Sequence, residues 1–214
     1  MSGHNHDDRQ PITPETVDWD EMYRQNEAMW SGQVNGSLAV EVENLSPGRA
    51  LDVGCGEGAD AIWLAERGWD VVAIDISSTA VERGRLEAES RGVAIEWLAT
   101  DILNSPPEPG SFELVSLHYP AFAAARHDDV VKALTDAVAV EGTLLLVGHA
   151  PPSDPEASSF DPSDWVAVGD VADELGDLEH WDVEANETRP RLGAHHHESP
   201  HTHDVVLRAK RLTT

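Results

Sequence analysis

Residues 51–59 read Leu51-Asp52-Val53-Gly54-Cys55-Gly56-Glu57-Gly58-Ala59, an apolar run followed by three closely spaced glycines. The apolar run predicts a buried strand, and the glycines predict a sharp turn that a ligand can approach without meeting Cβ atoms. A helix that begins at Gly58 would present free N–H groups to that ligand. This stretch therefore predicts a strand, a turn and a helix that together bind a polar molecule.

On both sides of this turn, short apolar runs alternate with amphipathic segments, which is typical of a parallel sheet covered by helices on both faces. We predict strands over residues 49–53, 69–74, 93–97, 112–117, 142–147, 178–188 and 204–211. Helices are predicted over 58–67, from an N-cap within 77–79 to 91, over 128–140 and over 162–175, the last capped by Asp161. The expected fold class is α/β, with a doubly wound, mostly parallel, seven-stranded sheet.

The region before the first strand has two parts. Residues 1–15 are polar and lack apolar periodicity, which predicts a flexible tail. Residues 16–46 carry aromatic and apolar residues at helical spacing, interrupted at Ser31-Gly32, which predicts one or two helices. We expect a single domain over 16–214, with this helical segment, a core over 47–150 and a C-terminal part over 151–214 that completes the sheet.

Composition argues against several functional classes. The 214 residues include 14 Lys and Arg against 40 Asp and Glu, a net charge of −26, which repels nucleic acids and anionic membranes. The polar N-terminus and the absence of a long apolar run predict a soluble, cytoplasmic protein. A single cysteine, Cys55, excludes an intrachain disulfide and a multi-cysteine metal site. The acidic excess is either a solvated surface or an adaptation to high salt. The oligomeric state is open.

The glycine-rich turn fits two nucleoside cofactors. Gly54, Gly56 and Ala59 satisfy the G-x-G-x-x-G/A pattern of dinucleotide-binding proteins, and Asp75 lies about 20 residues on, where a ribose-binding acid is expected. Asp52 separates the two possibilities, because a carboxylate beside the turn opposes a pyrophosphate but accepts an ammonium group. The residues therefore favour S-adenosylmethionine over NAD.

Residues 52–58 resemble motif I of the class I S-adenosylmethionine-dependent methyltransferases. Val71-Val72-Ala73-Ile74-Asp75 resembles the second-strand motif of that family, and Thr100-Asp101-Ile102 resembles the position after its third strand. The resemblance covers residues 17–214 and implies a Rossmann-like fold that binds S-adenosylmethionine. It implies that Asp52 and the turn hold the methionine end, Asp75 the ribose and Asp101 the adenine. The implied cofactor-binding residues are Asp52, Gly54, Cys55, Gly56, Gly58, Asp75, Ile76, Asp101 and Ile102.

The N-terminal segment contains Trp19-Asp20 and Trp30-Ser31-Gly32. In these residues it is similar to the aromatic N-terminal segment of the tellurite-resistance and thiopurine methyltransferase branch. This similarity implies an N-terminal helical lid over the cofactor, with Tyr23 and Trp30 lining the acceptor pocket. The alternative is that both are core residues that pack a helix on the sheet.

Methyl transfer from an activated sulfonium depends mainly on positioning of the acceptor, so a dedicated catalytic residue is optional. If a base is needed, His118 and Tyr119 follow the fourth strand, at the carboxyl edge where open α/β sheets bind ligands. The alternative for His118 is a structural loop histidine. His149 follows the fifth strand in an analogous position, and Cys55 is interpreted as a packing residue.

A histidine-rich stretch, residues 195–203, contains five histidines in nine residues. It binds a metal such as Zn²⁺, lines the acceptor pocket or remains solvated. Because its spacing matches no defined site, we assign no metal ligands. The sequence thus predicts a methyltransferase that acts on a small-molecule acceptor. The alternatives are an NAD-dependent oxidoreductase, for which Tyr119 has no lysine nearby, and a non-enzymatic cofactor- or metal-binding protein.

Overall fold

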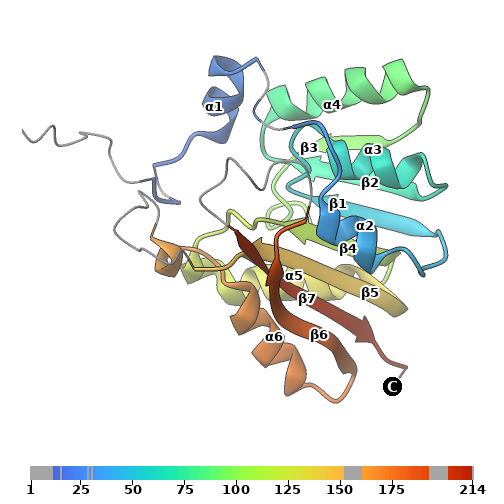
Figure 1. The fold of residues 1–214 in the computed structure, drawn as a ribbon, viewed down its shortest axis with the longest axis vertical. Coiled ribbons are helices and arrows are strands. Elements are labelled where there is room, and N and C mark those ends of the chain that lie inside the picture. The colour runs from blue at the N-terminus through green and yellow to red at the C-terminus, as the bar shows by residue number, and fades with distance from the viewer. Residues whose placement is uncertain are drawn as a thin grey trace, which may run out of the picture.

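The structure is a computed structural model that describes residues 12–14, 16–27, 29, 31–151, 161–192 and 202–213. Within these residues, seven strands form one sheet in the order β3-β2-β1-β4-β5-β7-β6 (Figure 1). The parallel strands are β1 (Arg49–Val53), β2 (Asp70–Asp75), β3 (Glu96–Ala99), β4 (Phe112–His118) and β5 (Val138–His149). β7 (His203–Arg211) runs antiparallel to both β5 and β6 (Trp181–Pro190). The predicted doubly wound α/β fold is confirmed.

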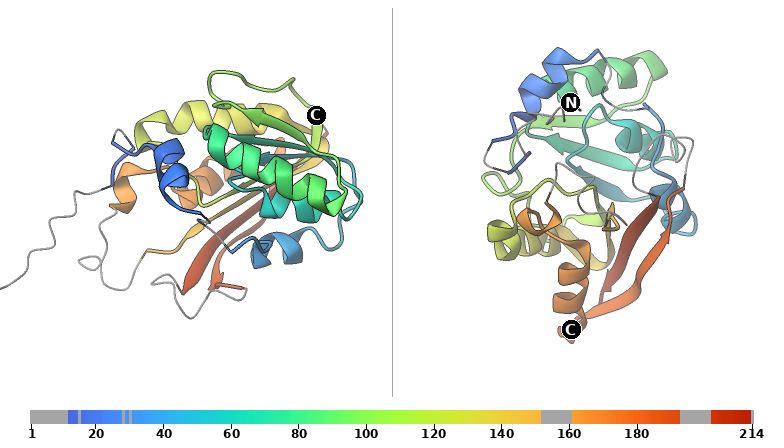
Figure 2. Two further views of the ribbon diagram at one scale, coloured as in Figure 1. Left: turned by 90° about the horizontal axis from the view of Figure 1, so that it is seen from above. Right: turned by 60° about the vertical axis from the view of Figure 1, so that its left-hand side comes forward.

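Helices cover both faces of the sheet (Figure 2). On one face lie α2 (Gly36–Glu41), α3 (Ala59–Ala65) and α4 (Ser78–Arg91), and on the other lie α5 (His127–Ala137) and α6 (Val168–Gly176). Each face has its own buried apolar cluster, and adjacent strand residues such as Ala50 and Leu51 belong to different clusters. This assignment follows from the alternation of side chains along a strand. No helix among the described residues is long and apolar enough to cross a bilayer.

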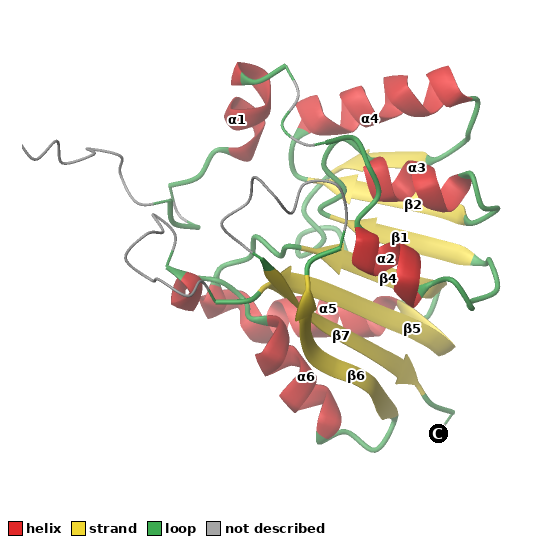
Figure 3. Cartoon of the chain, viewed as in Figure 1, coloured by secondary structure: helices red, strands yellow, loops and turns green. Residues whose placement is uncertain are grey.

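α1 (Trp19–Gln25) stands apart from both helical layers, beside α4 (Figure 3). Its Asp20 carboxylate accepts hydrogen bonds from Ser77 Oγ at 2.7 Å and from the Thr79 backbone at 2.9 Å, next to the start of α4. Arg83 of α4 donates to the Tyr23 carbonyl at 2.8 Å and pairs with Glu57 of the glycine turn at 2.9 Å. These contacts fix the predicted N-terminal helical segment beside the turn.

Several predicted elements have different limits in the structure; the fifth strand, predicted over 142–147, spans 138–149, and the sixth, predicted over 178–188, spans 181–190. The helix predicted over 162–175 is interrupted, because Trp165 forms a bridge with Ala123 between the 3₁₀ helix η3 (Pro162–Asp164) and α6. The helix predicted over 128–140 ends at Ala137, because Val138 already pairs with β4. The third strand is shorter than predicted, since β3 pairs with β2 only over 96–99. A second 3₁₀ helix, η1 (Ala124–Arg126), precedes α5.

Trp97 of β3 fills the space between the glycine turn and α4. A Cβ added at Gly58 would lie 2.3 Å from its ring, and one added at Gly84 would lie 2.6 Å from it. Such distances are far inside van der Waals contact. The absence of a side chain at these two positions therefore lets α4 approach the turn closely.

We expect Gly84→Ala to lower the free energy of unfolding by about 1–3 kcal/mol, although alanine has the higher helix propensity, because its Cβ overlaps Trp97. The matched control is Gly169→Ala on α6, where an added Cβ meets nothing within 4 Å and should stabilise the protein by up to about 1 kcal/mol. Urea denaturation measures both changes. A stabilising Gly84→Ala would contradict the close packing of Trp97.

The net charge of −26 generates a second prediction. We expect the melting temperature to rise when KCl is increased from about 0.05 to 2 M, since salt screens repulsion between the acidic side chains. KCl is preferred to a sulfate salt, which strengthens apolar burial whatever the charge. A melting temperature that does not rise would favour an ordinary solvated acidic surface.

Candidate functional site

The glycine-rich turn joins β1 to α3 at the carboxyl edge of the sheet, where Gly54 is exposed and Gly56 and Gly58 are buried. Gly54, Gly56 and Gly58 have φ angles of 64°, 54° and 81°, in the left-handed region that favours glycine. The Cys55 backbone donates to the Ile74 carbonyl at 3.0 Å, which ties the turn to β2. Burial raises the pKa of the Cys55 thiol well above its ordinary value, so it stays uncharged, in agreement with a packing role.

On the face of the sheet that α2 and α3 cover, the residues at the carboxyl edge are polar. Ala50, Ala73, Leu114, Val147 and Val206 belong to the apolar cluster on this face. Because side chains alternate along a strand, residues two positions closer to the carboxyl edge share that face. These residues are Asp52, Asp75, Ser116, His149 and Asp204, with His118 two positions beyond Ser116. The sheet thus changes from apolar to polar at the edge that carries the glycine turn.

Asp52 is the most unusual of these groups. Only 3% of the residue is exposed, and its Oδ2 has no hydrogen-bond partner among the described residues. Burial and the carboxylates of Asp60 and Asp75 raise the pKa of Asp52 well above its ordinary value. Several acids near one point favour a positively charged ligand, whose binding would restore the ionised carboxylate.

Asp75 holds the backbone of the glycine turn, and Asp101 holds the loop that follows β3. Asp75 accepts hydrogen bonds from the Gly56 and Ser77 backbone N–H groups, both at 2.8 Å, and burial raises the pKa of Asp75 in spite of them. Asp101 accepts from the Leu103 backbone and the Asn104 side chain, both at 2.9 Å. Each carboxylate oxygen has a second lone pair, so these acids retain the capacity to accept hydrogen bonds from a ligand.

The two isoleucines that follow these acids have different surroundings. Ile76 is 64% exposed, although it directly follows the buried Asp75. Ile102 is only 2% exposed and belongs to the apolar cluster beneath α5 and α6. Ile76 therefore offers a free apolar surface at the edge of the sheet, whereas the Ile102 side chain is part of the core.

The predicted catalytic residues lie at the same edge. The His118 side chain is 5% exposed, its Nδ1 lies 3.5 Å from Asp60 Oδ2, and neither ring nitrogen forms a hydrogen bond with the described part of the chain. Burial lowers the pKa of His118, so the ring is neutral at neutral pH. Tyr119 donates to Asp204 Oδ2 at 3.2 Å, and burial with the Asp204 charge raises the pKa of its hydroxyl. Tyr119 is therefore a hydrogen-bond donor.

Sequence reasoning missed three acids of this region. Asp60 accepts from the Asn35 backbone and side chain, both at 2.7 Å, and thereby joins α2 to α3. Asp204 is 2% exposed at the start of β7, and Asp20 links α1 to α4. Among 40 acidic residues, no local pattern separates a buried carboxylate from a solvated one. Asp60 alone has a local signal, since it stands in the first turn of the helix that follows the glycines.

Two predictions concern residues outside the described part of the chain. Tyr23 is 4% exposed on α1, but Trp30 lies outside the described residues, and the predicted lid pair stays untested. Residues 193–201, which hold most of the histidine-rich stretch, and residues 1–11 and 15 of the tail predicted over 1–15 also lie outside them. Within the described ranges, no three His, Cys, Asp or Glu side chains are grouped so that they could hold a metal ion.

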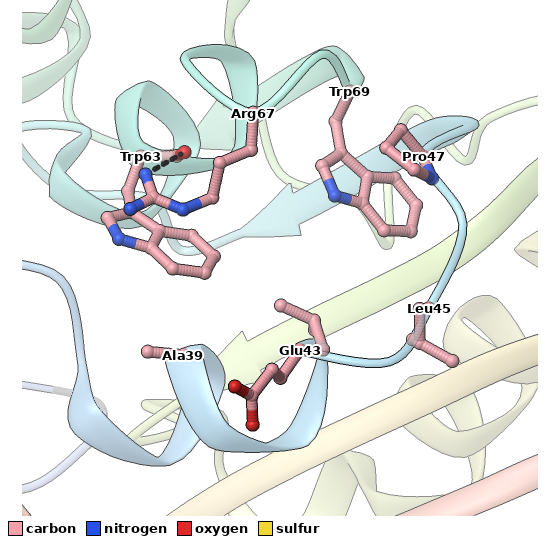
Figure 4. Close-up of a pocket in the computed structure, with 8 residues that line it drawn as sticks. Ala39, Glu43, Leu45, Pro47, Trp63, Arg67 and Trp69 are labelled. Atoms are coloured by element: carbon pink, nitrogen blue, oxygen red, sulfur yellow. Dashed lines mark hydrogen bonds between the residues drawn. The ribbon is translucent and has the colours of Figure 1, made fainter.

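A separate pocket of about 480 Å³ lies at the opposite edge of the sheet (Figure 4). Pro47 and Trp69, which precede β1 and β2, line it together with Trp63, and the Arg67 guanidinium lies 3.8 Å from the Trp63 ring centre. None of the predicted site residues lines this pocket. The candidate site is therefore the carboxyl edge with its buried acids.

Comparison with known proteins identifies a family and several relatives. Residues 50–141 match the family described as "Methyltransferase domain". Over 144 residues the chain is 29% identical to the uncharacterized methyltransferase YcgJ of Bacillus subtilis. The aligned region covers 65% of this chain and 56% of that protein. The chain spans about half or less of the first curated relatives, which include a demethylmenaquinone methyltransferase from Thermus thermophilus and a ribosomal RNA methyltransferase from Alcanivorax borkumensis.

Two solved structures share the fold. One, described as "Conversion of a Disulfide Bond into a Thioacetal Group during Echinomycin Biosynthesis", has a TM-score of 0.72 at 22% identity and covers 91% of this chain and 90% of its own. TehB from Haemophilus influenzae has a TM-score of 0.67 at 16% identity and covers 91% of this chain and 66% of its own. At such identities the likeness concerns the fold.

The buried Asp52 generates a prediction about stability. Its pKa is higher in the folded state than in the unfolded chain, so the cost of ionising it grows as the pH rises above about 4. We expect Asp52→Asn to raise the free energy of unfolding by about 1–3 kcal/mol at pH 7, with a smaller gain toward pH 4. Urea denaturation at several pH values measures the change. The control is Asp173→Asn at an exposed position on α6, and a destabilising Asp52→Asn would contradict the buried, unpaired carboxylate.

Proposed function

Because residues 50–141 belong to the methyltransferase domain family and the sheet has the class I S-adenosylmethionine-dependent methyltransferase order, we propose that this protein binds S-adenosylmethionine and methylates a small-molecule acceptor. The observation that carries the proposal is Asp52, a buried carboxylate with an unpartnered oxygen beside bare glycine backbone. Such a group requires a cationic partner to be ionised at low cost.

The residues fit a ligand that is cationic at one end and a nucleoside at the other. In this proposal Asp52 accepts the ammonium group, and the backbone of Gly54 to Gly58 surrounds the methionine end. Asp75 accepts the ribose hydroxyls, Asp101 accepts the adenine amino group, and the exposed Ile76 side chain covers an apolar ring face. A dinucleotide would bring its pyrophosphate toward the buried Asp52 and Asp60 carboxylates, which disfavours NAD.

Once bound, the sulfonium supplies a methyl group that is already activated. The chain therefore has to hold the acceptor in line with that group and exclude water. Asp20 and Arg83 fix α1 beside the glycine turn, which supports the proposal that α1 covers the bound cofactor. We assign Tyr23 and Trp30 to this cover, and we assign His118 and Tyr119 to the acceptor side of the edge.

The charge of the chain supports a neutral or cationic small molecule as the acceptor. A net charge of −26 and the acidic edge of the sheet repel the phosphates of RNA and DNA and anionic membrane surfaces, and we propose that the protein acts in the cytoplasm on a diffusible molecule. Some relatives are named for RNA substrates, so this choice rests on charge rather than on kinship.

Calorimetric titration with S-adenosylhomocysteine tests the proposal. For the wild type we expect a dissociation constant in the micromolar range, which corresponds to a binding free energy on the order of −8 kcal/mol. Asp52→Asn should weaken binding of S-adenosylmethionine roughly ten- to hundredfold, because the ammonium group loses a charge-assisted hydrogen bond. Ile76→Ala should weaken binding about three- to tenfold without a change in melting temperature, since its side chain is exposed.

The matched control is Leu86→Ala on α4, which removes another exposed apolar side chain, 51% accessible, and should leave binding unchanged. Titration with NAD is the second control. Binding of NAD without binding of either sulfur nucleoside would overturn the proposal in favour of an oxidoreductase. Binding of none of the three would favour a non-enzymatic role.

A further inference from the structure

Three polar side chains meet where β4 and β5 end and β7 begins. The Tyr119 ring stacks on the His149 ring, with centres 4.2 Å apart and planes at 25°. The Tyr119 hydroxyl donates to Asp204 Oδ2 at 3.2 Å, and His149 Nδ1 lies 3.7 Å from Asp204 Oδ1. His149 and Asp204 also face each other in the β5–β7 register. One buried carboxylate therefore lies against a phenol and an imidazole at the candidate site.

Tyr119 is held in a costly conformation. Its φ of 55° lies in the left-handed region, which a residue with a large side chain rarely adopts. Its backbone N–H donates to the Val147 carbonyl of β5 at 2.6 Å, which fixes the residue in this position. Backbone strain of this kind gathers at functional sites, where the surrounding structure imposes it. Here it places the Tyr119 ring against His149 and its hydroxyl against Asp204.

Asp204 lacks a full set of partners. It is 2% exposed, and its Oδ1, the oxygen nearest to His149, makes no hydrogen bond within the described residues. The His149 side chain is 34% exposed, against 5% for His118. A carboxylate behind a histidine holds the ring with Nδ1 protonated and stabilises the imidazolium that forms when Nε2 takes a proton. Such contacts are commonly longer before the substrate is bound.

We propose that His149, positioned by Asp204, is the base that accepts the proton of the methyl acceptor. The inference rests on the proposed function and selects acceptors whose reacting oxygen or nitrogen carries a proton. As that atom's lone pair forms the bond to the methyl carbon, the electron pair of the broken carbon–sulfur bond remains on sulfur. The acceptor proton moves to His149 Nε2 and is later released to water. Tyr119 is a positioning residue that holds Asp204.

Among the described residues, Arg191, His118 and Asp60 are further charged or titratable groups near this unit. Arg191, after β6, lies with its guanidinium carbon 4.8 Å from the Tyr119 ring centre. The His118 ring is 6.3 Å from the Tyr119 ring, and Asp60 of α3 lies behind His118. Within the described part of the chain, Asp204 is the carboxylate that faces His149 in the β5–β7 register, and it is therefore the group to change in a test.

The first test is the tautomer of His149, read from the ¹⁵N shifts of its ring at about pH 8.5, where an ordinary imidazole is neutral. In the wild type we expect the neutral His149 ring to carry its proton on Nδ1. In Asp204→Asn we expect a larger fraction of the tautomer that carries the proton on Nε2. The matched control is Glu174→Gln, because Glu174 pairs with His127 at 3.0 Å on α5 and α6. It should change the signals of His127 alone. An unchanged His149 tautomer in Asp204→Asn would overturn the proposal.

The second test follows methyl transfer from tritium-labelled S-adenosylmethionine to a phenol, a primary amine and a thioether. His149→Gln should lower transfer to the phenol and the amine by about a hundredfold or more and leave transfer to the thioether, which has no proton to lose, unchanged. An equal loss with the thioether would indicate a structural role and overturn the proposal. Tyr119→Phe is the second variant if Asp204→Asn does not fold.

Calorimetry with S-adenosylhomocysteine on the same samples separates this inference from the proposed function. Absence of binding to the wild type contradicts the proposed function. Binding to every variant together with an unchanged His149 tautomer contradicts only the role of His149.

Discussion

Negative charge buried at the carboxyl edge of the sheet is the constraint on which the rest of this structure depends. Asp52 and Asp75 are at most 8% exposed, and they end two neighbouring parallel strands. Carboxylates in such surroundings carry a large desolvation cost, and the chain offsets part of it with backbone N–H groups rather than with Lys or Arg. The remaining cost raises the pKa of Asp52, which makes the site receptive to a cation.

The surrounding elements serve this edge in different ways. Gly58 and Gly84 admit Trp97, which brings α4 close to the turn, and Asp60 joins α3 to α2 through Asn35. On the opposite side of the edge, Asp204 lies between a phenol and an imidazole. The cofactor half and the acceptor half of the proposed site therefore share one feature. Each contains a buried carboxylate, Asp52 or Asp204, with one oxygen that accepts no hydrogen bond from the described residues.

The fold and the turn could be predicted from the sequence because both rest on local patterns. Apolar runs of strand length and the glycines at 54, 56 and 58 are visible in any short window. The placement of Asp60 and Asp204 could not be predicted, because their burial depends on pairings across 25 and 85 residues with Asn35 and Tyr119. The predicted helix over 162–175 was wrong at Trp165 for the same reason, since a tertiary bridge to Ala123 outweighs the local helical pattern.

Ser77 takes part in two contacts that join the halves of the molecule. Its backbone N–H donates to Asp75, and its hydroxyl donates to Asp20 of α1. A displacement of α1 therefore breaks a bond to the residue that also steadies the acid assigned to the ribose. In the proposed site, the exchange of spent for fresh nucleoside is therefore coupled to movement of α1, a helix that Ser77, Thr79 and Arg83 hold against the sheet.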